Sequence, residues 1–246
     1  HLASWNNSLS RREQIIKSLP PPDHNDVTSW TFEDMLESVG GSVYGFNAFN
    51  LLMEDREWWE IWTKDYISAL SQYIDGQIKQ QEGKKTLVLE VCAGDGRLTK
   101  YLSLQTKSGG RKSPVDFIAT DDGSWKIDPT FPVEKLDVEQ ALKKFGGDPT
   151  TNLIVICAWH PMNCDLTYLL RECPNVSEYI LIGQKDDGNC GCPWLTWGNE
   201  HFRGENDTEE ISEELKRDWD RHDLDDMSKM QLSRYNSSEG KNSHTV

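Results

Sequence analysis

TLVLEVCAGDGRLTKYL, residues 86–102, is the stretch that decides the predicted fold. It reads as a short apolar strand, then a turn of small residues that includes Gly94 and Gly96, and finally a helix. Glycine allows positive φ and lets a ligand approach the backbone, and the first turn of the next helix presents unpaired N–H groups. A strand, a glycine turn and a helix in this order are typical of a loop that binds a nucleotide cofactor.

Short apolar runs and helical segments alternate after this stretch. The pattern predicts further strands at 115–120, 133–136, 153–158 and 178–183, and helices at 138–145 and 166–172. Two short stretches, 219–224 and 231–235, are expected to close the sheet as an antiparallel hairpin. The fold class is therefore α/β, with a doubly wound, mainly parallel seven-stranded sheet, helices on both faces and an N-terminal helical extension.

The rest of the chain divides by composition. Residues 1–30 form a polar, proline-containing arm, and residues 31–85 form the helical extension, with an amphipathic helix expected over 55–79. Residues 86–235 form the Rossmann-like domain, with an acidic helix expected around 209–218. The polar residues 236–246 are expected to be a disordered tail.

Net charge and hydropathy limit the function classes. The 246 residues carry a formal net charge of −15, which disfavours nucleic acid as a partner. The sequence has neither an apolar run of membrane-spanning length nor the apolar core of a signal peptide. We expect a cytoplasmic protein with no membrane contact; the sequence leaves its oligomeric state open.

The six cysteines lack CxxC pairing and are expected to be reduced thiols, several of them in core strands. The close pair Cys190 and Cys192 leaves one alternative open, half of a metal site that His201 or His222 would complete. That spacing is not the spacing of a standard zinc module, so no metal is expected.

Acidic residues follow the predicted strands. Glu90, Asp121 with Asp122, and Asp137 stand at the ends of the first three, and the fourth is followed by residues 158–161, AWHP. The carboxyl ends of parallel strands share one edge of a sheet, where ligands bind at the point of strand-order reversal. A dinucleotide prefers glycines and donors, whereas a cationic cofactor with a free ribose favours carboxylates.

These residues resemble the cofactor motifs of class I S-adenosylmethionine-dependent methyltransferases, over residues 86–184. The resemblance implies that Glu90 orients the loop or the cofactor ammonium group and that Asp121 accepts hydrogen bonds from the ribose hydroxyls. Asp137, beside Leu136, matches the acid that meets the adenine amino group. Cys92 departs from the family pattern, in which glycine is commoner. The remaining predicted cofactor residues are Cys92, Ala93, Gly94, Asp95, Gly96, Asp122, Ala158 and Trp159.

The implied activity is methyl transfer from S-adenosyl-L-methionine to a small-molecule or protein acceptor. His160 is the candidate general base, because its intrinsic pKa lies near neutrality, although it could instead satisfy a loop carbonyl. Asp121, Asp122 and Asp137 could equally cap helices. Trp194 and Trp197 could cover an acceptor or pack their own loop.

Two other functions compete with this one. A methyltransferase-like module that binds or regulates without catalysis stays open. A nicotinamide-dependent oxidoreductase is disfavoured, because the GxGxxG spacing is absent.

Overall fold

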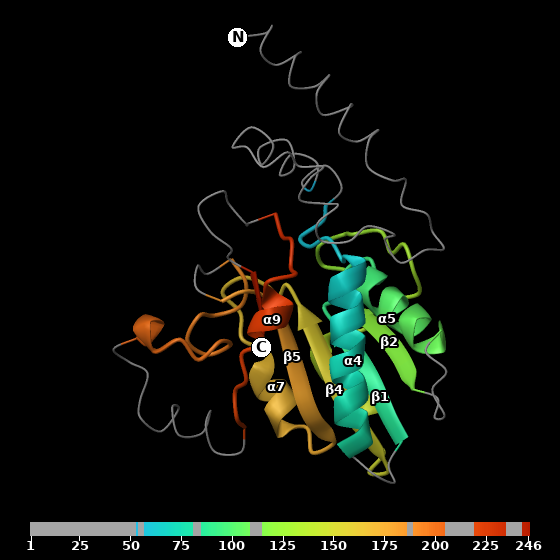
Figure 1. The fold of residues 1–246 in the computed structure, drawn as a ribbon. Coiled ribbons are helices and arrows are strands. Elements are labelled where there is room, and N and C mark those ends of the chain that lie inside the picture. Colours follow the sequence, from blue (N-terminus) through green and yellow to red (C-terminus); the bar gives the residue numbers. More distant parts are fainter. Residues whose placement is uncertain are drawn as a thin grey trace, which may run out of the picture.

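Six strands form one sheet in the order β3-β2-β1-β4-β5-β6. The computed structural model describes residues 53, 57–80, 85–108, 115–185, 189–204, 219–234 and 243–246 (Figure 1). The strands are β1 Lys85–Val91, β2 Asp116–Asp121, β3 Glu134–Lys135, β4 Thr151–Ala158, β5 Val176–Gln184 and β6 Ser243–Thr245. The helices are α4 Lys64–Gln80, α5 Arg97–Ser108, α6 Val138–Phe145, α7 Thr167–Glu172 and α9 Asp225–Ser228, with a 3₁₀ turn at Glu200–Phe202.

The two central strands set the position of the site. β1 pairs in parallel with β2 on one side and with β4 on the other. All eight residues of β4 are buried, as expected for a parallel strand covered on both faces. The strand order reverses between β1 and β4, so the loops that follow them diverge and leave a crevice at the carboxyl edge of the sheet.

Helices pack against both faces of the sheet. One apolar cluster joins α4, α5 and α9 to alternate residues of β1, β4 and β5, including Val88, Ile154 and Ile180. Figure 1 shows α4 running along this face with α5 beside it. The second cluster joins α6 and α7 to the other residues of the same strands, including Leu89 and Val155. The fold is mixed α/β with a mostly parallel sheet, consistent with a Rossmann-like fold.

The amphipathic helix begins later than predicted. Residues 57–63 are not helical, and α4 starts at Lys64. Thr63 is the reason, because its Oγ1 accepts a hydrogen bond from Tyr66 N (3.3 Å) and its carbonyl accepts one from Ile67 N (3.0 Å). Glu57, with φ of 55°, also interrupts helical geometry. Trp58, Trp59 and Trp62 therefore lie before α4 and not on its apolar face.

The C-terminal part of the prediction is wrong in three respects. Six strands, not seven, are present among the described residues, and residues 219–224 and 231–234 form no hairpin. Ser233 instead makes an isolated antiparallel bridge with Glu60. The expectation of disorder fails for residues 243–246, because β6 pairs antiparallel with β5.

Side-chain contacts explain why this polar end is ordered. Thr245 Oγ1 lies 2.8 Å from Tyr66 Oη and 3.0 Å from Gln231 Oε1, all of them buried. The predicted arm at 1–30 and the acidic helix at 209–218 lie outside the described residues. No described helix has the length and apolar character needed to cross a membrane.

Candidate functional site

A cavity of about 210 Å³ opens at the edge of the sheet where β1 and β4 end. Most of the residues predicted to bind a cofactor line it: Glu90, Cys92, Ala93, Gly94, Asp95, Asp121, Ala158 and Trp159, with His160 beside them. Gly96, Asp122, Leu136 and Asp137 are not among its lining residues. The structure thus brings eight of the twelve predicted cofactor residues together around one cavity.

The turn between β1 and α5 has the left-handed geometry that glycine favours. Gly94 and Gly96 have φ of 55° and 77°, and Cys92 has φ of 54°, which is uncommon for a residue with a Cβ. A Cβ on Gly96 would lie 2.7 Å from Val133 Cγ2, so this position needs glycine for packing. At Gly94 a Cβ would meet only Ile127 Cδ1, at 3.5 Å.

Glu90 anchors the first turn of α5. The side chain is 2% exposed, and its Oε2 accepts hydrogen bonds from Thr99 N (2.9 Å) and Thr99 Oγ1 (2.5 Å). Burial raises the pKa of Glu90 to about 8, since desolvation disfavours the charged form. The predicted role in orienting the loop agrees with these contacts.

Asp121 ties β2 to the glycine turn. Its Oδ2 accepts a hydrogen bond from Gly94 N (2.9 Å), and its Oδ1 accepts one from Gly123 N (2.7 Å). A carboxylate has about four lone-pair sites, so two acceptor sites remain. Asp122 is exposed and accepts a hydrogen bond from Ser124 N (2.8 Å), which makes it a turn residue outside the cavity.

Asp137 is the N-cap of α6. Its side chain accepts from Gln140 N (2.8 Å), while Gln140 Oε1 accepts from Asp137 N (3.2 Å), which completes a capping box. Of the two roles that the sequence left open, the structure shows capping. Leu136, also outside the cavity, belongs to the connection from β3 to α6, and its N–H donates to Asp121 O (3.0 Å).

His160 has both ring nitrogens engaged with backbone groups. Nε2 accepts a hydrogen bond from Leu166 N (3.0 Å), and Nδ1 lies 3.2 Å from Pro161 O. Nδ1 therefore carries the proton, and the ring is neutral. Burial lowers the pKa of His160, which agrees with this tautomer. The loop-satisfying role that the sequence left open accounts for these contacts.

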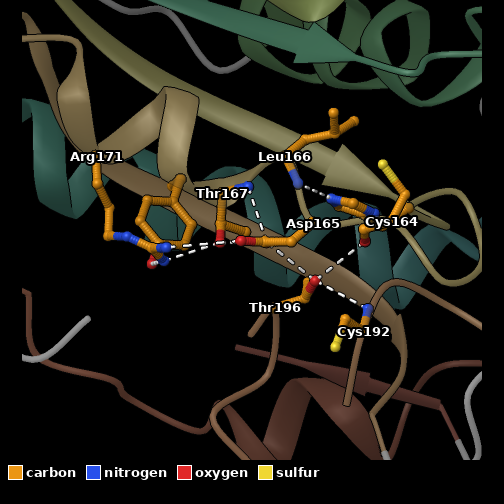
Figure 2. Close-up of polar contacts among 9 residues, drawn as sticks. Cys164, Asp165, Leu166, Thr167, Arg171, Cys192 and Thr196 are labelled. Carbon is orange, nitrogen blue, oxygen red and sulfur yellow. Dashed lines mark hydrogen bonds and ion pairs between the residues drawn. The ribbon is translucent and has the colours of Figure 1, made fainter. Parts of the chain in front are cut away.

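A polar network holds the loop after β4 against the loop after β5 (Figure 2). Asp165 Oδ1 accepts hydrogen bonds from Thr167 N (3.0 Å), Thr167 Oγ1 (2.6 Å) and Thr196 Oγ1 (3.1 Å). Thr196 Oγ1 also accepts from Cys192 N (3.0 Å), and Arg171 lies on the other side of Asp165 at 3.7 Å. The network fixes the segment from Trp159 to Met162, which forms one wall of the cavity.

Trp194 and Trp197 pack the loop after β5. Each is 2% exposed and neither lines the cavity. Trp197 Nε1 donates to Cys190 O (2.7 Å), which fixes the loop on itself. Trp159 does line the cavity, with φ of 55°.

Four of the residues that line the cavity were not predicted from the sequence. Trp59 and Trp62 precede α4, Trp125 follows β2, and Arg234 follows α9, yet all four line the cavity. Trp62 lies within the helix predicted over 55–79 and packs in the buried cluster with α4 while also lining the cavity, whereas no periodic signal marked Trp125 and Arg234. Only the folding of distant segments onto one edge brings them together.

Acidic groups outnumber basic groups in the cavity, and they carry the larger charge even though the raised pKa of Glu90 keeps it mostly protonated at pH 7. Five acids line it, Glu57, Glu60, Glu90, Asp95 and Asp121, against two bases, Arg97 and Arg234. Arg97 is committed to Asp95, with Nε 2.5 Å from Oδ2, and its guanidinium lies 4.1 Å above the Trp58 ring. The cavity therefore suits a ligand with positive charge.

The cysteines are free thiols. A hydrogen bond with Cys92 and burial raise the pKa of Cys157, and burial raises the pKa of Cys190 to about 12. No three His, Cys, Asp or Glu side chains within the described ranges are arranged to hold a metal ion. The alternative of a metal site at Cys190 and Cys192 has no support in this part of the chain.

Comparison with known proteins finds likeness only among solved structures. No protein-family model matches the chain, and no curated protein matches it. Among solved structures it is similar to the CMeT domain of the citrinin polyketide synthase, at 16% identity and a TM-score of 0.36. The matched part covers 65% of this chain and 43% of that chain, so this chain spans less than half of its length. The contacts of each residue around the cavity, described above, indicate its role.

Proposed function

We propose that this protein is an S-adenosyl-L-methionine-dependent methyltransferase acting on a small-molecule or protein acceptor. The observation that carries the proposal is the cavity at the reversal between β1 and β4, which combines a glycine turn with carboxylates and tryptophans. A cofactor with a sulfonium, an ammonium group and an adenine ring offers cations to the carboxylates and an aromatic face to the tryptophans. A dinucleotide would bring its pyrophosphate to an acidic wall.

The residues present fit this cofactor. The left-handed turn at Cys92 and Gly94 brings backbone to the cavity surface, and Asp121 keeps acceptor sites for ribose hydroxyls. Leu136 and Asp137 do not line the cavity, so the predicted adenine contact through them is not part of the proposal. When bound, S-adenosyl-L-methionine supplies a methyl group bonded to a positively charged sulfur.

The chain contributes position and shielding. Methyl transfer is an in-line displacement, so holding the acceptor atom in line and excluding water supplies much of the rate. Trp59, Trp62 and Trp159 exclude water from the cavity walls. His160 does not act as the base in this proposal, because both of its ring nitrogens are already hydrogen-bonded.

A second candidate is a binding module without catalysis. The same contacts of His160 favour it, because they leave the cavity with no histidine base. Binding measurements alone do not separate the candidates, since both retain the cofactor. Turnover with a broad acceptor panel separates them.

The test begins with calorimetry. We expect micromolar binding of S-adenosylmethionine and S-adenosylhomocysteine and no binding of NAD; no binding of either adenosyl compound would overturn the proposal. Asp121→Ala should weaken S-adenosylhomocysteine binding about tenfold through lost ribose contacts. Asp122→Ala, outside the cavity, is the matched control and should leave affinity unchanged. Equal affinities for both variants would refute the role of Asp121.

A further inference from the structure

Part of the cavity wall is built from two indole rings that meet at right angles. The rings of Trp59 and Trp125 have centroids 5.6 Å apart and planes 89° apart, and both residues line the cavity. Trp62 lines the same wall and packs on Tyr66 with centroids 5.6 Å apart. The ring faces that this edge-to-face pair leaves uncovered can attract an ammonium group through their π electrons.

The charges around these rings also favour a cation. Glu57 and Glu60 line the cavity from the same segment, and Leu232 N–H holds Glu60 by donating to Oε1 (2.6 Å). The guanidinium of Arg234 lies 4.3 Å from the centroid of the Trp59 ring. Arg234 thus covers one face of Trp59, which leaves the exposed ring of Trp125 as the open aromatic surface beside the two glutamates. An anionic ligand would meet Arg234 but also the carboxylates of both glutamates.

Trp125 is open to a ligand. It is 58% exposed, the largest exposure among the large hydrophobic side chains in the described part of the chain. Met162, also on the cavity wall, is 48% exposed. Apolar surface that stays open at a cavity mouth is stabilised when a ligand removes it from water.

We propose that the acceptor is an amine, bound as its ammonium form against Trp59 and Trp125 with Glu57 and Glu60 beside it. The inference rests on the proposed function and names its substrate class. The ammonium first loses a proton to solvent at the exposed Glu57 side of the cavity. The nitrogen lone pair then forms the new N–C bond, while the bond from that carbon to the sulfonium sulfur breaks and leaves its electron pair on sulfur.

The test uses a cation and its uncharged isostere. Choline and 3,3-dimethylbutan-1-ol have nearly the same shape and differ in charge, so their affinities for the full chain isolate the recognition of the cation. We expect choline to bind at least about tenfold more tightly in calorimetry, with and without S-adenosylhomocysteine. Equal affinities would overturn the inference. If S-adenosylhomocysteine binds in the same titrations, the proposed function survives that result.

Variants locate the cation. Trp125→Ala should weaken choline binding about threefold to fivefold, and Trp125→Phe, which keeps an aromatic face, should lose less. Glu57→Gln should weaken choline and leave the neutral isostere unchanged. Tyr168→Ala removes a side chain with 48% exposure outside the cavity and is the control. Trp125 is exposed, so its replacement leaves the core intact; unchanged choline affinity in Trp125→Ala would refute the placement.

Discussion

Replacing Glu90 by Gln should make the folded protein less sensitive to rising pH. The carboxyl group is buried, and burial raises its pKa from 4.5 to about 8. Between these two values the folded state keeps a proton that the unfolded state loses, so the stability of the wild type falls as pH rises. Below about pH 4.5 this contribution is fully present, and above pH 8 it is lost. Glutamine carries no ionisable proton and removes the effect.

The size follows from the two pKa values. A pKa difference of one corresponds to about 1.4 kcal/mol, so the stability of Glu90→Gln relative to wild type should rise by about 3 kcal/mol from pH 5 to pH 8. The hydrogen bonds from Thr99 to Oε2 persist in the variant, because the amide oxygen accepts from both donors. The new NH₂ group changes stability by an amount that does not depend on pH. The change with pH of the stability difference between variant and wild type therefore reports on the carboxyl group alone.

Urea unfolding followed by tryptophan fluorescence at pH 5, 6, 7 and 8 measures this slope. Glu139→Gln, which removes one charge from the exposed first turn of α6, reports the effect of net charge alone. A stability difference between Glu90→Gln and wild type that stays constant over this range would refute the raised pKa.

Two further predictions concern the turn and the loops. Gly96→Ala should destabilise the fold by about 3 kcal/mol, because a Cβ at a left-handed position would also press on Val133, whereas Gly94→Ala should cost about 1 kcal/mol. Urea unfolding measures both, and the reverse order would contradict the assigned packing. Asp165→Ala should raise amide hydrogen exchange in the loops after β4 and β5, since it removes the acceptor that joins them, and leave α4 unchanged. Amide hydrogen exchange in both loops that is unchanged from wild type would show that the network is not needed to hold them.

The central sheet was predictable because burial on both faces leaves a direct trace in the sequence. The predicted strand at 153–158 is a continuous apolar run within β4, and α6 was predicted with its observed bounds, Val138–Phe145, with Asp137 left open as its N-cap. The C-terminal strand was not predictable in this way. Its three residues are polar and are ordered by partners far away in the chain, such as Tyr66.

The site was only partly predictable, because residue type does not say which partner a polar group finds. Asp137 and His160 have the right chemistry for a ligand, and both are engaged by backbone groups. No sequence motif marked Trp59, Trp62 and Trp125 as residues that line the cavity. Trp59 and Trp125 lie far apart in the sequence and meet because Thr63 delays the start of α4 and the loop after β2 folds back.

The backbone contacts of Glu90 and Asp121 bear on function as well as on folding. Each carboxylate that accepts from a fixed N–H has its orientation set before any ligand arrives, so binding need not order it. A cation bound beside Glu90 would favour its ionised form and lower its pKa from about 8. Binding of a cationic cofactor near pH 7 should therefore release a proton, and binding of its demethylated product, which lacks the sulfonium charge, should release less. A preformed Glu90 carboxyl group that ionises when the cation arrives would thus let the cavity discriminate the methyl donor from the spent cofactor.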